Sequence, residues 1–386
     1  MVVNLTNKII SADFTSQFSV HKLNLPFKII LYPPQIYTLV STSVIVNRYV
    51  LNIGLNFMAK QRVLVTGGAG YIGSHTCKLL STEGYDPIVV DNLSTGNKWA
   101  VKWGPLEICD IRDNDALSLI MNKYKPVAVA HFASCCYVGE SVENPEKYYN
   151  NNVSGMLSLL KTMNKNQVRK IIFSSSCSTY GNPQYIPIDE THPQIPINPY
   201  GFTKYICERI LSDYHRTLDI DFVALRYFNA AGADPEAEIG ELHEPEPHLV
   251  PRILDAALGK TDHFLIHGTD YDTDDGTCVR DYVHVIDIAK AHLKAIEHIL
   301  KSKSAEFINL GNGSGFSVKE VIDKVLEITG SKIKVIEGDR RDGDPAILIS
   351  DSQRASEILD WSPDYPDLTS IIGHAWQWHQ SKKNDR

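Results

Sequence analysis

The feature that most constrains the fold is a glycine-rich turn between an apolar run and a helix-like stretch. Val63-Leu64-Val65 leads into Thr66-Gly67-Gly68-Ala69-Gly70-Tyr71-Ile72-Gly73, and a helical pattern runs from about Tyr71 to Glu83. Glycines at 67, 70 and 73 allow a tight turn and a close approach of the backbone to a diphosphate. The free N–H groups at the start of the helix would face the phosphates. A glycine motif that opens the first βα unit therefore predicts a dinucleotide site.

Apolar runs and helical patterns then alternate along the chain. The expected strands lie at 87–90, 127–132, 170–173 and 221–226, and the expected helices at 115–123, 145–165 and 199–217. Continuous apolar strands separated by helices indicate a parallel sheet covered on both faces. The predicted fold class is α/β, a Rossmann doubly wound parallel sheet with a smaller C-terminal α/β lobe.

The alternation of strand and helix patterns ends after residue 229, where a segment rich in glycine, proline and acidic residues begins. Regular pattern returns with a strand at 307–310 and a helix at 318–329. We therefore expect three parts: an extension over 1–60, a Rossmann domain over 61–229, and mainly a second lobe over 230–386. Part of 282–310 is expected to return to the Rossmann domain.

The first 57 residues contain one acidic residue, Asp13, and many hydroxyl and amide side chains. Their longest apolar stretch is interrupted by Asn47-Arg48, so it is too short for a membrane span. The order of regions that marks a secretory signal is missing, although the scarcity of acids has a faint likeness to an organelle transit peptide. We favour Met58 as the natural start and expect little order before it.

Composition restricts the partners and the compartment. A net charge of −8 argues against nucleic acid or an anionic membrane as the main partner. The seven cysteines are odd in number and form no C-x-x-C pair, which predicts a reduced, cytoplasmic protein without structural zinc. No metal site is predicted.

Two carboxylates follow apolar runs on the expected cofactor side. Asp91 comes directly after Ile88-Val89-Val90, where a carboxylate meets the ribose hydroxyls and repels a 2′-phosphate. This favours NAD over NADP as the cofactor. Asp110-Ile111 is placed to touch the adenine.

The chemistry is predicted to lie at Tyr200 and Lys204. Asn198 and Pro199 cap and open a helix there, and a spacing of four puts the phenol and the ammonium on one face. The ammonium and a positive nicotinamide ring would bring the phenol pKa from about 10 toward neutrality, which makes a general base. Ser176, with Ser178 as second choice, follows an apolar strand and can bond the reacting oxygen.

These residues together resemble the extended short-chain dehydrogenase/reductases and, within them, the UDP-glucose 4-epimerase family. The resemblance covers about residues 62–380. Its most specific segments are VLVTGGAGYIGSHTC from Val63, VGESVENPEKYYNNNVSG from Val138, NPYGFTK from Asn198, LRYFNAAGADP from Leu225 and DGTCVRDYVHVIDIA from Asp275.

The resemblance implies a role for each matching residue. It makes Ser176, Tyr200 and Lys204 the catalytic residues. It implies contacts to NAD from Gly67, Gly70, Tyr71, Ile72, Gly73, Asp91, Asn92, Asp110, Ile111, Phe132, Ala133, Asn151, Tyr200, Lys204 and Phe228. It implies that a UDP-sugar is held by Ser176, Tyr200, Asn229, His248, Arg280, Arg341 and Asp344, and guanidinium groups suit a diphosphate.

The implied reaction is reversible oxidation at C4. Tyr200 takes the proton of the 4-hydroxyl as hydride leaves C4, the 4-keto sugar turns over, and hydride returns to its other face. UDP-galactose and UDP-glucose would thereby be interconverted with bound NAD and no net redox change. The partners implied are a UDP-sugar and, as a homodimer, a second copy of the chain.

The sequence departs from the family pattern at three places. Cys136 stands where the family commonly has a lysine beside the cofactor, and His248 where an asparagine often contacts the nucleotide. Leu348 stands where a large aromatic often limits the size of the sugar. N-acetylated sugars therefore remain possible substrates.

Other functions remain to be considered, both within the epimerases and outside them. The sequence hardly distinguishes a UDP-glucose 4-epimerase from a 4-epimerase of UDP-xylose, UDP-arabinose or UDP-N-acetylglucosamine. A 4,6-dehydratase or a decarboxylase is disfavoured, because Cys177-Ser178 replaces the carboxylates that such enzymes place after the reacting hydroxyl. A non-catalytic NAD-binding regulator would have no reason to keep Tyr200, Lys204 and Ser176 together.

Three histidines have simpler interpretations than catalysis or metal binding. His131 lies in an apolar run and is expected to have a structural role. His243 and His248 stand among acids at a loose spacing, which favours a solvated loop.

Overall fold

A computed structural model describes residues 60–341 and 344–383, together with five short strands in the first 59 residues. The chain separates into two compact units, Met1–Ala59 and Lys60–Arg386. In the first unit β1 (Val2–Leu5) pairs with β2 (Lys8–Ser11), and β5 (Tyr49–Asn52) pairs with β3 (Ile30–Tyr32) and β4 (Ser43–Val46), all antiparallel. We expected poor order before residue 61, and most of those residues lie outside the part of the chain that the structure describes.

The second unit is built on a seven-stranded sheet in the order β16-β11-β10-β9-β6-β7-β8, in which every pair is parallel. Its strands are β6 (Arg62–Thr66), β7 (Asp86–Asp91), β8 (Leu106–Ile108), β9 (Ala128–His131), β10 (Lys170–Ser176), β11 (Asp221–Tyr227) and β16 (Ala305–Leu310). The strand order steps outward in both directions from β6 and β9, as in a doubly wound sheet. The predicted fold class is confirmed.

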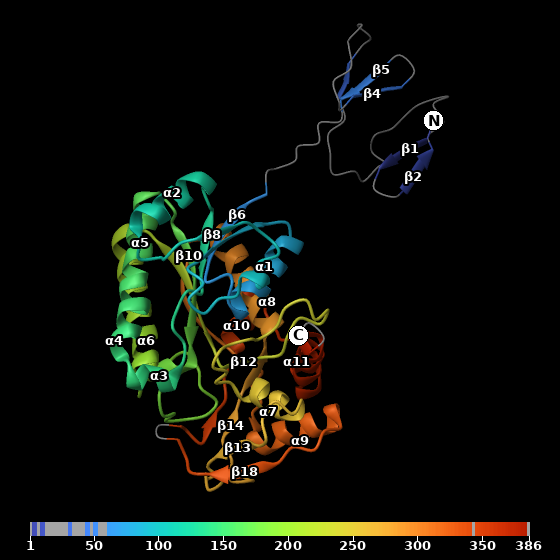
Figure 1. The fold of residues 1–386 in the computed structure, drawn as a ribbon. Helices are drawn as coiled ribbons and strands as arrows, with labels where there is room; N and C mark the ends of the chain where they lie inside the picture. The colour runs from blue at the N-terminus through green and yellow to red at the C-terminus, as the bar shows by residue number, and fades with distance from the viewer. Residues whose placement is uncertain are drawn as a thin grey trace. The chain divides into compact units, whose positions relative to one another are not determined.

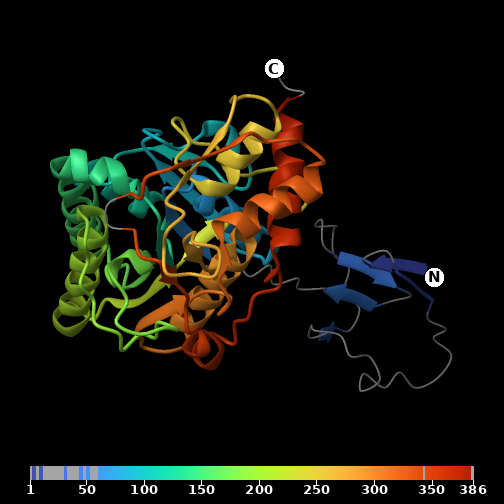
Figure 2. The same ribbon diagram turned by 90° about the horizontal axis from the view of Figure 1, so that it is seen from below.

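Helices cover both faces of this sheet because its strands are apolar on both sides. Along β6, Val63 and Val65 belong to one core cluster and Leu64 to the other, as the period of two requires. One face carries α2 (Asn114–Tyr124), α5 (Gly155–Lys165) and α6 (Pro199–Leu218), and the other α1 (Tyr71–Thr82), α8 (Val285–Lys301) and α10 (Gln353–Leu359). Figure 1 shows the first group in teal and green on one side of the sheet, and Figure 2 shows the same separation from below.

The helix expected over 145–165 is interrupted. The structure divides it into α4 (Pro145–Tyr148), a π-helix η3 (Tyr149–Ser154) and α5, after a short α3 (Val138–Glu143) that the sequence did not indicate. A π-helical turn adds one residue to the helical repeat and is frequent at functional sites. Here it contains the asparagines at 151 and 152.

The smaller lobe is made by segments after residue 229. Its helices α7 (Leu249–Ala257), α9 (Val318–Thr329) and α11 (Leu368–Lys383) share one apolar cluster and lie in the lower part of Figure 1. Its strands are β12 (Asn229–Ala231), β13 (Phe264–His267), β14 (Val279–Arg280), β15 (Tyr282–His284), β17 (Phe316–Ser317), β18 (Val335–Gly338) and β19 (Ile347–Leu348). Between them, α8 and β16 return to the main sheet, because β16 pairs with β11.

Single-turn 3-10 helices complete the unit at η2 (Lys98–Ala100) and η4 (Cys177–Thr179). Within the described part of the chain, no helix has both the length and the apolar character needed to cross a bilayer.

Candidate active site

A cavity of about 470 Å³ opens at the carboxyl ends of β6, β7, β9, β10 and β11. This is the edge where parallel α/β sheets bind ligands. The predicted residues that line it are Gly67, Gly70, Tyr71, Ile72, Gly73, Asp91, Asn92, Asp110, Ile111, Phe132, Ala133, Asn151, Ser176, Tyr200, Lys204, Phe228, Asn229, His248, Arg280 and Asp344. Arg341 is exposed and is not among the lining residues.

The glycine turn has no room for side chains. A Cβ on Gly67 would lie 2.5 Å from the backbone nitrogen of Ala133, and one on Gly73 would lie 2.3 Å from the carbonyl oxygen of Gly67. Gly67 also has φ +73°, which side chains rarely tolerate. No side chain caps the N-terminus of α1 at Gly70. The turn therefore leaves an uncovered helix end beside the cavity, which fits the phosphates of a dinucleotide.

Asp91 connects this turn to the end of β7. Its carboxylate accepts hydrogen bonds from the backbone N–H of Ala69 at 3.0 Å and from that of Leu93 at 2.8 Å. Burial raises the pKa of Asp91, while the two N–H bonds act to lower it. Each carboxylate oxygen keeps a second lone pair for a further donor, such as a ribose hydroxyl.

Asn92 and Asp110 lie together at the same end of the cavity. The Asn92 amide donates to Asp110 at 3.1 Å, and Arg112 forms an ion pair with Asp110 at 2.7 Å. The hydrogen bonds from Arg112 hold the pKa of Asp110 well below its usual range. Arg112 was not singled out by the sequence, since a lone arginine two residues after an aspartate carries no specific signal.

Asn198 and Pro199 begin α6, as the sequence predicted. The Asn198 side chain accepts from the backbone N–H of Gly201 at 2.8 Å, and Pro199 occupies the first turn. A Cβ on Gly201 would lie 2.3 Å from the carbonyl oxygen of Ser178. Glycine at this position lets the first turn of α6 approach η4 closely, and this contact brings Tyr200 next to Ser176.

Lys204 lies behind Tyr200 and is only 2% exposed. Its Nζ donates to the carbonyl oxygen of Ser174 at 2.8 Å and lies 5.8 Å from the centre of the Tyr200 ring. Burial lowers the pKa of Lys204 to about 8. The pair is thus in place, on one face of α6, as its spacing predicted.

The pKa of Tyr200 differs from the prediction. In the chain alone it is raised well above 10, because burial and the neighbouring Cys136 and Tyr227 disfavour the phenolate. A hydrogen bond with Ser176 acts in the opposite direction. The predicted lowering invoked a positive nicotinamide ring as well as Lys204, and the side chains by themselves do not supply enough positive charge. The bond to Tyr200 favours Ser176 over Ser178 as the hydroxyl partner.

The altered stretch at Cys135-Cys136 is held by Asn152 from the π-helix. The Asn152 side chain accepts from the Cys135 N–H at 2.8 Å and donates to the Cys135 carbonyl at 3.0 Å and to the Thr203 hydroxyl at 2.9 Å. It therefore links the cavity wall to α6. Asn152 has no distinctive signal in the sequence, because it lies within a run of three asparagines.

A buried ion pair fixes α6 to the sheet. Glu208, one turn beyond Lys204, binds Arg226 of β11 through two bonds of 2.7 and 2.9 Å and accepts from Ser175 of β10 at 2.6 Å. Both charged side chains are buried. This pair was not predicted, because its signal in the sequence is only the spacing of four between Lys204 and Glu208.

The substrate half of the cavity is formed by the smaller lobe. The guanidinium of Arg280 donates to the carbonyl oxygen of Val279 at 2.9 Å and lies 3.4 Å from the Asp344 carboxylate. Leu348 also lines the cavity and is partly buried. These contacts keep Arg280 at the cavity wall with donors to spare, because a guanidinium has five.

His131 has the structural role that was expected. Its Nδ1 lies 2.7 Å from the Thr66 hydroxyl, and its ring stacks on Phe173 at 5.8 Å. Burial, with Lys204 nearby, lowers its pKa to about 3. The imidazole is therefore neutral and packed.

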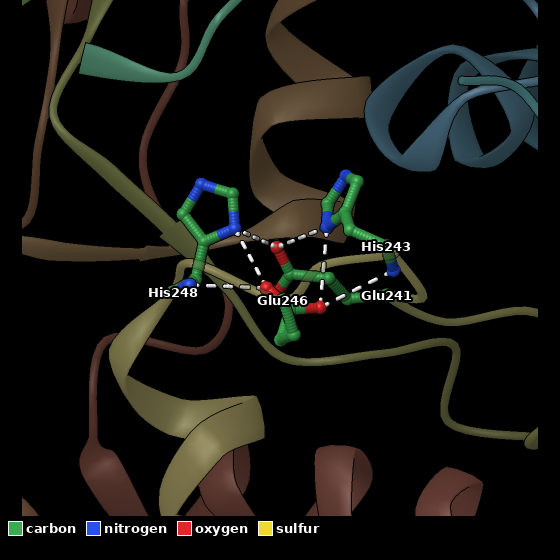
Figure 3. Close-up of side chains that lie close together, drawn as sticks. All are labelled: Glu241, His243, Glu246 and His248. Carbon is green, nitrogen blue, oxygen red and sulfur yellow. Dashed lines mark hydrogen bonds and ion pairs between the residues drawn. The ribbon is translucent and has the colours of Figure 1, made fainter. Parts of the chain in front are cut away.

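The interpretation of His243 and His248 as part of a solvated loop is wrong. Figure 3 shows both rings directed toward Glu241 and Glu246, and the Glu241 side chain is only 4% exposed. Burial alone would raise the pKa of Glu246, but hydrogen bonds from His243 and His248 lower it to about 2. The two glutamates raise the pKa of His248 well above 6.5. The loop is a compact cluster of charged groups at the cavity wall.

Comparison with known proteins places the chain in a family. Residues 63–311 match the model of the NAD dependent epimerase/dehydratase family. The UDP-glucose 4-epimerase of Rhizobium leguminosarum bv. trifolii is 50% identical over 83% of this chain and 98% of its own length.

Solved structures give the same result. The UDP-glucose 4-epimerase of Brucella ovis in complex with NAD has a TM-score of 0.81 and 50% identity, over 82% of this chain and 98% of its own. That of Bifidobacterium longum in complex with NAD⁺ and UDP has a TM-score of 0.80 and 38% identity, over 84% of this chain and 100% of its own. The glycine turn, the Ser176–Tyr200–Lys204 group and these matches together show that the chain belongs to the NAD dependent epimerase/dehydratase family.

Proposed function

We propose that the chain is a UDP-glucose 4-epimerase, which interconverts UDP-galactose and UDP-glucose by reversible oxidation at C4 with bound NAD. The observation that carries this proposal is the buried group formed by Tyr200, Lys204 and Ser176 in the cavity that also contains the glycine turn. The enzymes of known name that are about half identical to the chain over nearly their whole length support it.

The residues present fit NAD. The glycine turn would hold the diphosphate at the uncovered end of α1, and Asp91 would bond the ribose hydroxyls. When bound, oxidised NAD supplies a hydride acceptor for C4 and a positive charge beside the phenol. Asp91 repels a 2′-phosphate at the ribose, so the site favours NAD over NADP.

Tyr200 is the general base of the proposed reaction. Its Oη would take the proton of the C4 hydroxyl and give it back after the 4-keto sugar has turned over. Lys204 holds positive charge behind the ring, and the Ser176 hydroxyl is hydrogen-bonded to the phenol. Both stabilise the phenolate against the burial that disfavours it.

Elimination chemistry is disfavoured at this site. Cys177 and Ser178 follow Ser176 in η4, where dehydratases place an acid and a base. Cys177 is buried, and burial raises the pKa of its thiol to about 12. Neither group can exchange protons in the manner of a carboxylate near neutral pH.

The UDP-sugar is assigned to the smaller lobe. Arg280, Asn229, His248 and Asp344 line the cavity on that side, and Arg280 supplies the positive charge that a diphosphate needs. Arg341 lies outside the cavity wall and would need to move inward to reach a ligand. This division supports a Rossmann domain up to residue 229 and a substrate lobe beyond it.

The chain is proposed to work as a homodimer. Val142, Tyr149, Leu157 and Phe202 are exposed apolar side chains on α3, η3, α5 and α6, which pack against one another. A second copy would cover them. Light scattering after gel filtration should give twice the chain mass for the wild type and a monomer for Leu157→Glu. A monomeric wild type would reject the dimer.

The cytoplasm is the proposed compartment. All seven cysteines are free thiols, and five of them are buried. Thiols persist in this number in a reducing compartment.

The function is tested with purified protein and three substrates in separate reactions, without added NAD. UDP-galactose should be converted to UDP-glucose, which shows both the activity and a co-purified cofactor. Conversion of UDP-N-acetylgalactosamine or UDP-xylose at a higher kcat/KM would replace the proposed substrate by that sugar. No product from any of them, with NAD then added, would reject the epimerase assignment.

A further inference from the structure

Four potential metal ligands meet on the loop between β12 and α7. Glu241, His243, Glu246 and His248 each offer one ligand atom, and these four atoms all lie within 4.8 Å of one another. Figure 3 shows the two imidazoles facing the two carboxylates from opposite sides. The cluster lies outside the Ser176–Tyr200–Lys204 group, although Glu241, His243 and His248 also line the cavity wall.

The contacts within the cluster alternate between nitrogen and oxygen. His248 Nδ1 lies 2.8 Å from Glu241 Oε1 and 3.0 Å from Glu246 Oε1. His243 Nδ1 lies 3.2 Å from Glu246 Oε2 and 3.5 Å from Glu241 Oε1. Ligands about 2.0 Å from a tetrahedral zinc ion lie about 3.3 Å from one another. His248 and His243 meet different oxygens of Glu246, so for either oxygen three of these distances are comparable to edges of such a coordination shell.

Three of the four side chains are largely buried, and that of His248 is 41% exposed. Glu241 and His243 are 4% and 13% exposed at their side chains, and the Tyr137 ring lies 5.8 Å from that of His243 and 6.4 Å from that of His248. With both imidazoles neutral, as metal ligands must be, a divalent cation would balance the charge of the two carboxylates, a role that His248 fills in the metal-free chain because the glutamates raise its pKa.

The cluster also has an outer layer that orients the ligands. The backbone N–H groups of His243 and His248 donate to Glu246 at 3.3 and 3.0 Å. Supporting bonds of this kind fix the orientation of ligand side chains in metal sites. The second acidic group in the described residues, formed by Asp234, Glu236 and Glu238, differs because the Lys78 ammonium already occupies its centre.

We propose that Glu241, His243, Glu246 and His248 form a binding site for a divalent first-row transition metal ion, with zinc as the best match. Two imidazole nitrogens and two carboxylate oxygens suit this class of ion, whereas magnesium and calcium prefer oxygen ligands alone. The ion would cross-link residues 241–248, the part of the loop directly before α7, beside the cavity.

The site has a consequence for the substrate side, which rests on the proposed function. When Nδ1 of His248 binds the metal, its Nε2 must carry the proton and becomes a fixed donor. His248 lines the cavity and its side chain is 41% exposed, so this donor can face a bound UDP-sugar. His248 is therefore a positioning residue whose orientation depends on the metal.

Cobalt(II) is the probe for the site. Full-length protein is treated with a chelator, dialysed and titrated with cobalt(II), and the visible absorption is recorded. The expected result is one cobalt per chain with the intense bands of a tetrahedral site. Sulfur-to-cobalt charge transfer should be missing, because the four ligands contain no thiolate.

Matched variants locate the ion. His243→Ala and Glu246→Gln should lose the stoichiometric bands while retaining the far-ultraviolet circular dichroism of the wild type. Glu236→Gln, in the group filled by Lys78, and Cys136→Ser, at the nearest cavity thiol, should retain them. Zinc X-ray absorption of the wild type adds a measurement that needs no variant, and it should show only nitrogen and oxygen neighbours.

Several outcomes would overturn the site. They are failure of the wild type to bind cobalt, unchanged bands in His243→Ala and Glu246→Gln, or sulfur neighbours that disappear in Cys136→Ser. The substrate consequence is tested separately, since removal of the metal should raise KM for UDP-galactose more than it lowers kcat. If no epimerase activity exists at all, the cobalt titration still decides the metal site, so the two failures are distinguishable.

Discussion

At Tyr200 the protein places a phenol in surroundings that oppose its ionisation. Burial raises the pKa of Tyr200, and the pKa of Lys204 is itself lowered to about 8. A permanently ionised phenol would be hard to maintain in this cavity. The arrangement instead suits a base that becomes effective only when further positive charge enters the site, which is the condition that a bound oxidised cofactor provides.

Replacing Tyr200 by phenylalanine removes only the phenolic oxygen. We expect Tyr200→Phe to reduce kcat for epimerisation by roughly 10²–10⁴-fold, the usual contribution of a general base. NAD content, read from the absorbance of the released cofactor, should not change. Tyr205→Phe, on the same helix, is the control and should retain full activity. A Tyr200→Phe enzyme with most of its activity would remove the phenol from the mechanism.

Asp91 has two roles that two substitutions can separate. Its charge repels a 2′-phosphate, and its oxygens bind the N–H groups of Ala69 and Leu93. Asp91→Asn loses the charge but keeps one acceptor, whereas Asp91→Ala loses both. Each should shift preference toward NADP by roughly 10-fold or more, because a nearby like charge is worth over 1 kcal/mol. Titrations with both cofactors measure this, and unchanged discrimination in Asp91→Asn would refute the ribose assignment.

At the scale of elements, α6 carries the site because it is fixed at both ends of its first three turns. Asn198 caps its start, and Glu208 binds Arg226 and Ser175 on two neighbouring strands. Tyr200 and Lys204 lie between these two anchors. The helix cannot slide along the sheet without separating a buried ion pair.

Removal of one member of that pair should be costly. We expect Glu208→Ala to lower the free energy of unfolding by about 3–5 kcal/mol, since it leaves Arg226 buried without its partner. Lys324→Ala, which breaks the exposed pair with Glu327, is the control and should cost under about 1 kcal/mol. Urea denaturation followed by circular dichroism gives both values. Similar losses in the two variants would mean that burial does not set the strength of the Glu208 pair.

Elements with a strong local pattern were predictable, and elements that depend on distant partners were not. The helix predicted at 199–217 is found at Pro199–Leu218, and the one at 318–329 is found with the same bounds. The short strands β12, β14 and β19 have two or three residues each and form because other segments pair with them. The π-helix at Tyr149–Ser154 has the same helical pattern in the sequence as the helices around it, and in the folded chain it packs on α6.

At the scale of the whole molecule, four buried histidines couple stability to pH. Burial lowers the pKa of His75 and His292 to about 4 and that of His131 and His284 to about 3. Below about pH 6.5 the unfolded chain takes up protons at these positions that the folded chain does not. Their contribution is complete above pH 6.5 and is lost as the pH falls. Asp281 acts the other way, because burial raises its pKa to about 6.

We therefore expect the free energy of unfolding to fall steeply between about pH 6.5 and pH 4. Each histidine with a pKa near 4 contributes about 3 kcal/mol to this loss. His292→Gln should reduce the slope of the free energy of unfolding against pH by the amount that corresponds to about one proton. His263→Gln, at an exposed position, should leave that slope unchanged. Urea titrations at a series of pH values measure the slope. A stability that is flat over this range would contradict the assignment.

The second unit, Lys60–Arg386, contains the whole cavity and all the residues proposed for it. We expect deletion of residues 1–57 to leave the melting temperature, the NAD content and the epimerase activity unchanged. Differential scanning fluorimetry and the UDP-galactose assay test this on the two chain lengths side by side. A large fall in either quantity would show that the first residues take part in the fold of the second unit.

The sequence by itself determined the class of fold and indicated the residues of the candidate site. Strand and helix periodicity, the glycine turn and the spacing of Tyr200 and Lys204 are local properties, and they need only neighbouring residues to be interpreted. They were sufficient to predict the parallel sheet, the glycine turn, and Asp91, Asp110, Ser176, Tyr200 and Lys204 at the cavity, whereas the other predicted lining residues were implied by the family resemblance.

The tertiary structure alone decided the environments. Whether Tyr200 is easily ionised, whether Glu208 finds Arg226, and whether Glu241 and Glu246 meet His243 and His248 depend on burial and on the folded path of the chain. The physical reason is that desolvation and charge pairing act over a few ångströms in space, and distance along the sequence does not report that separation.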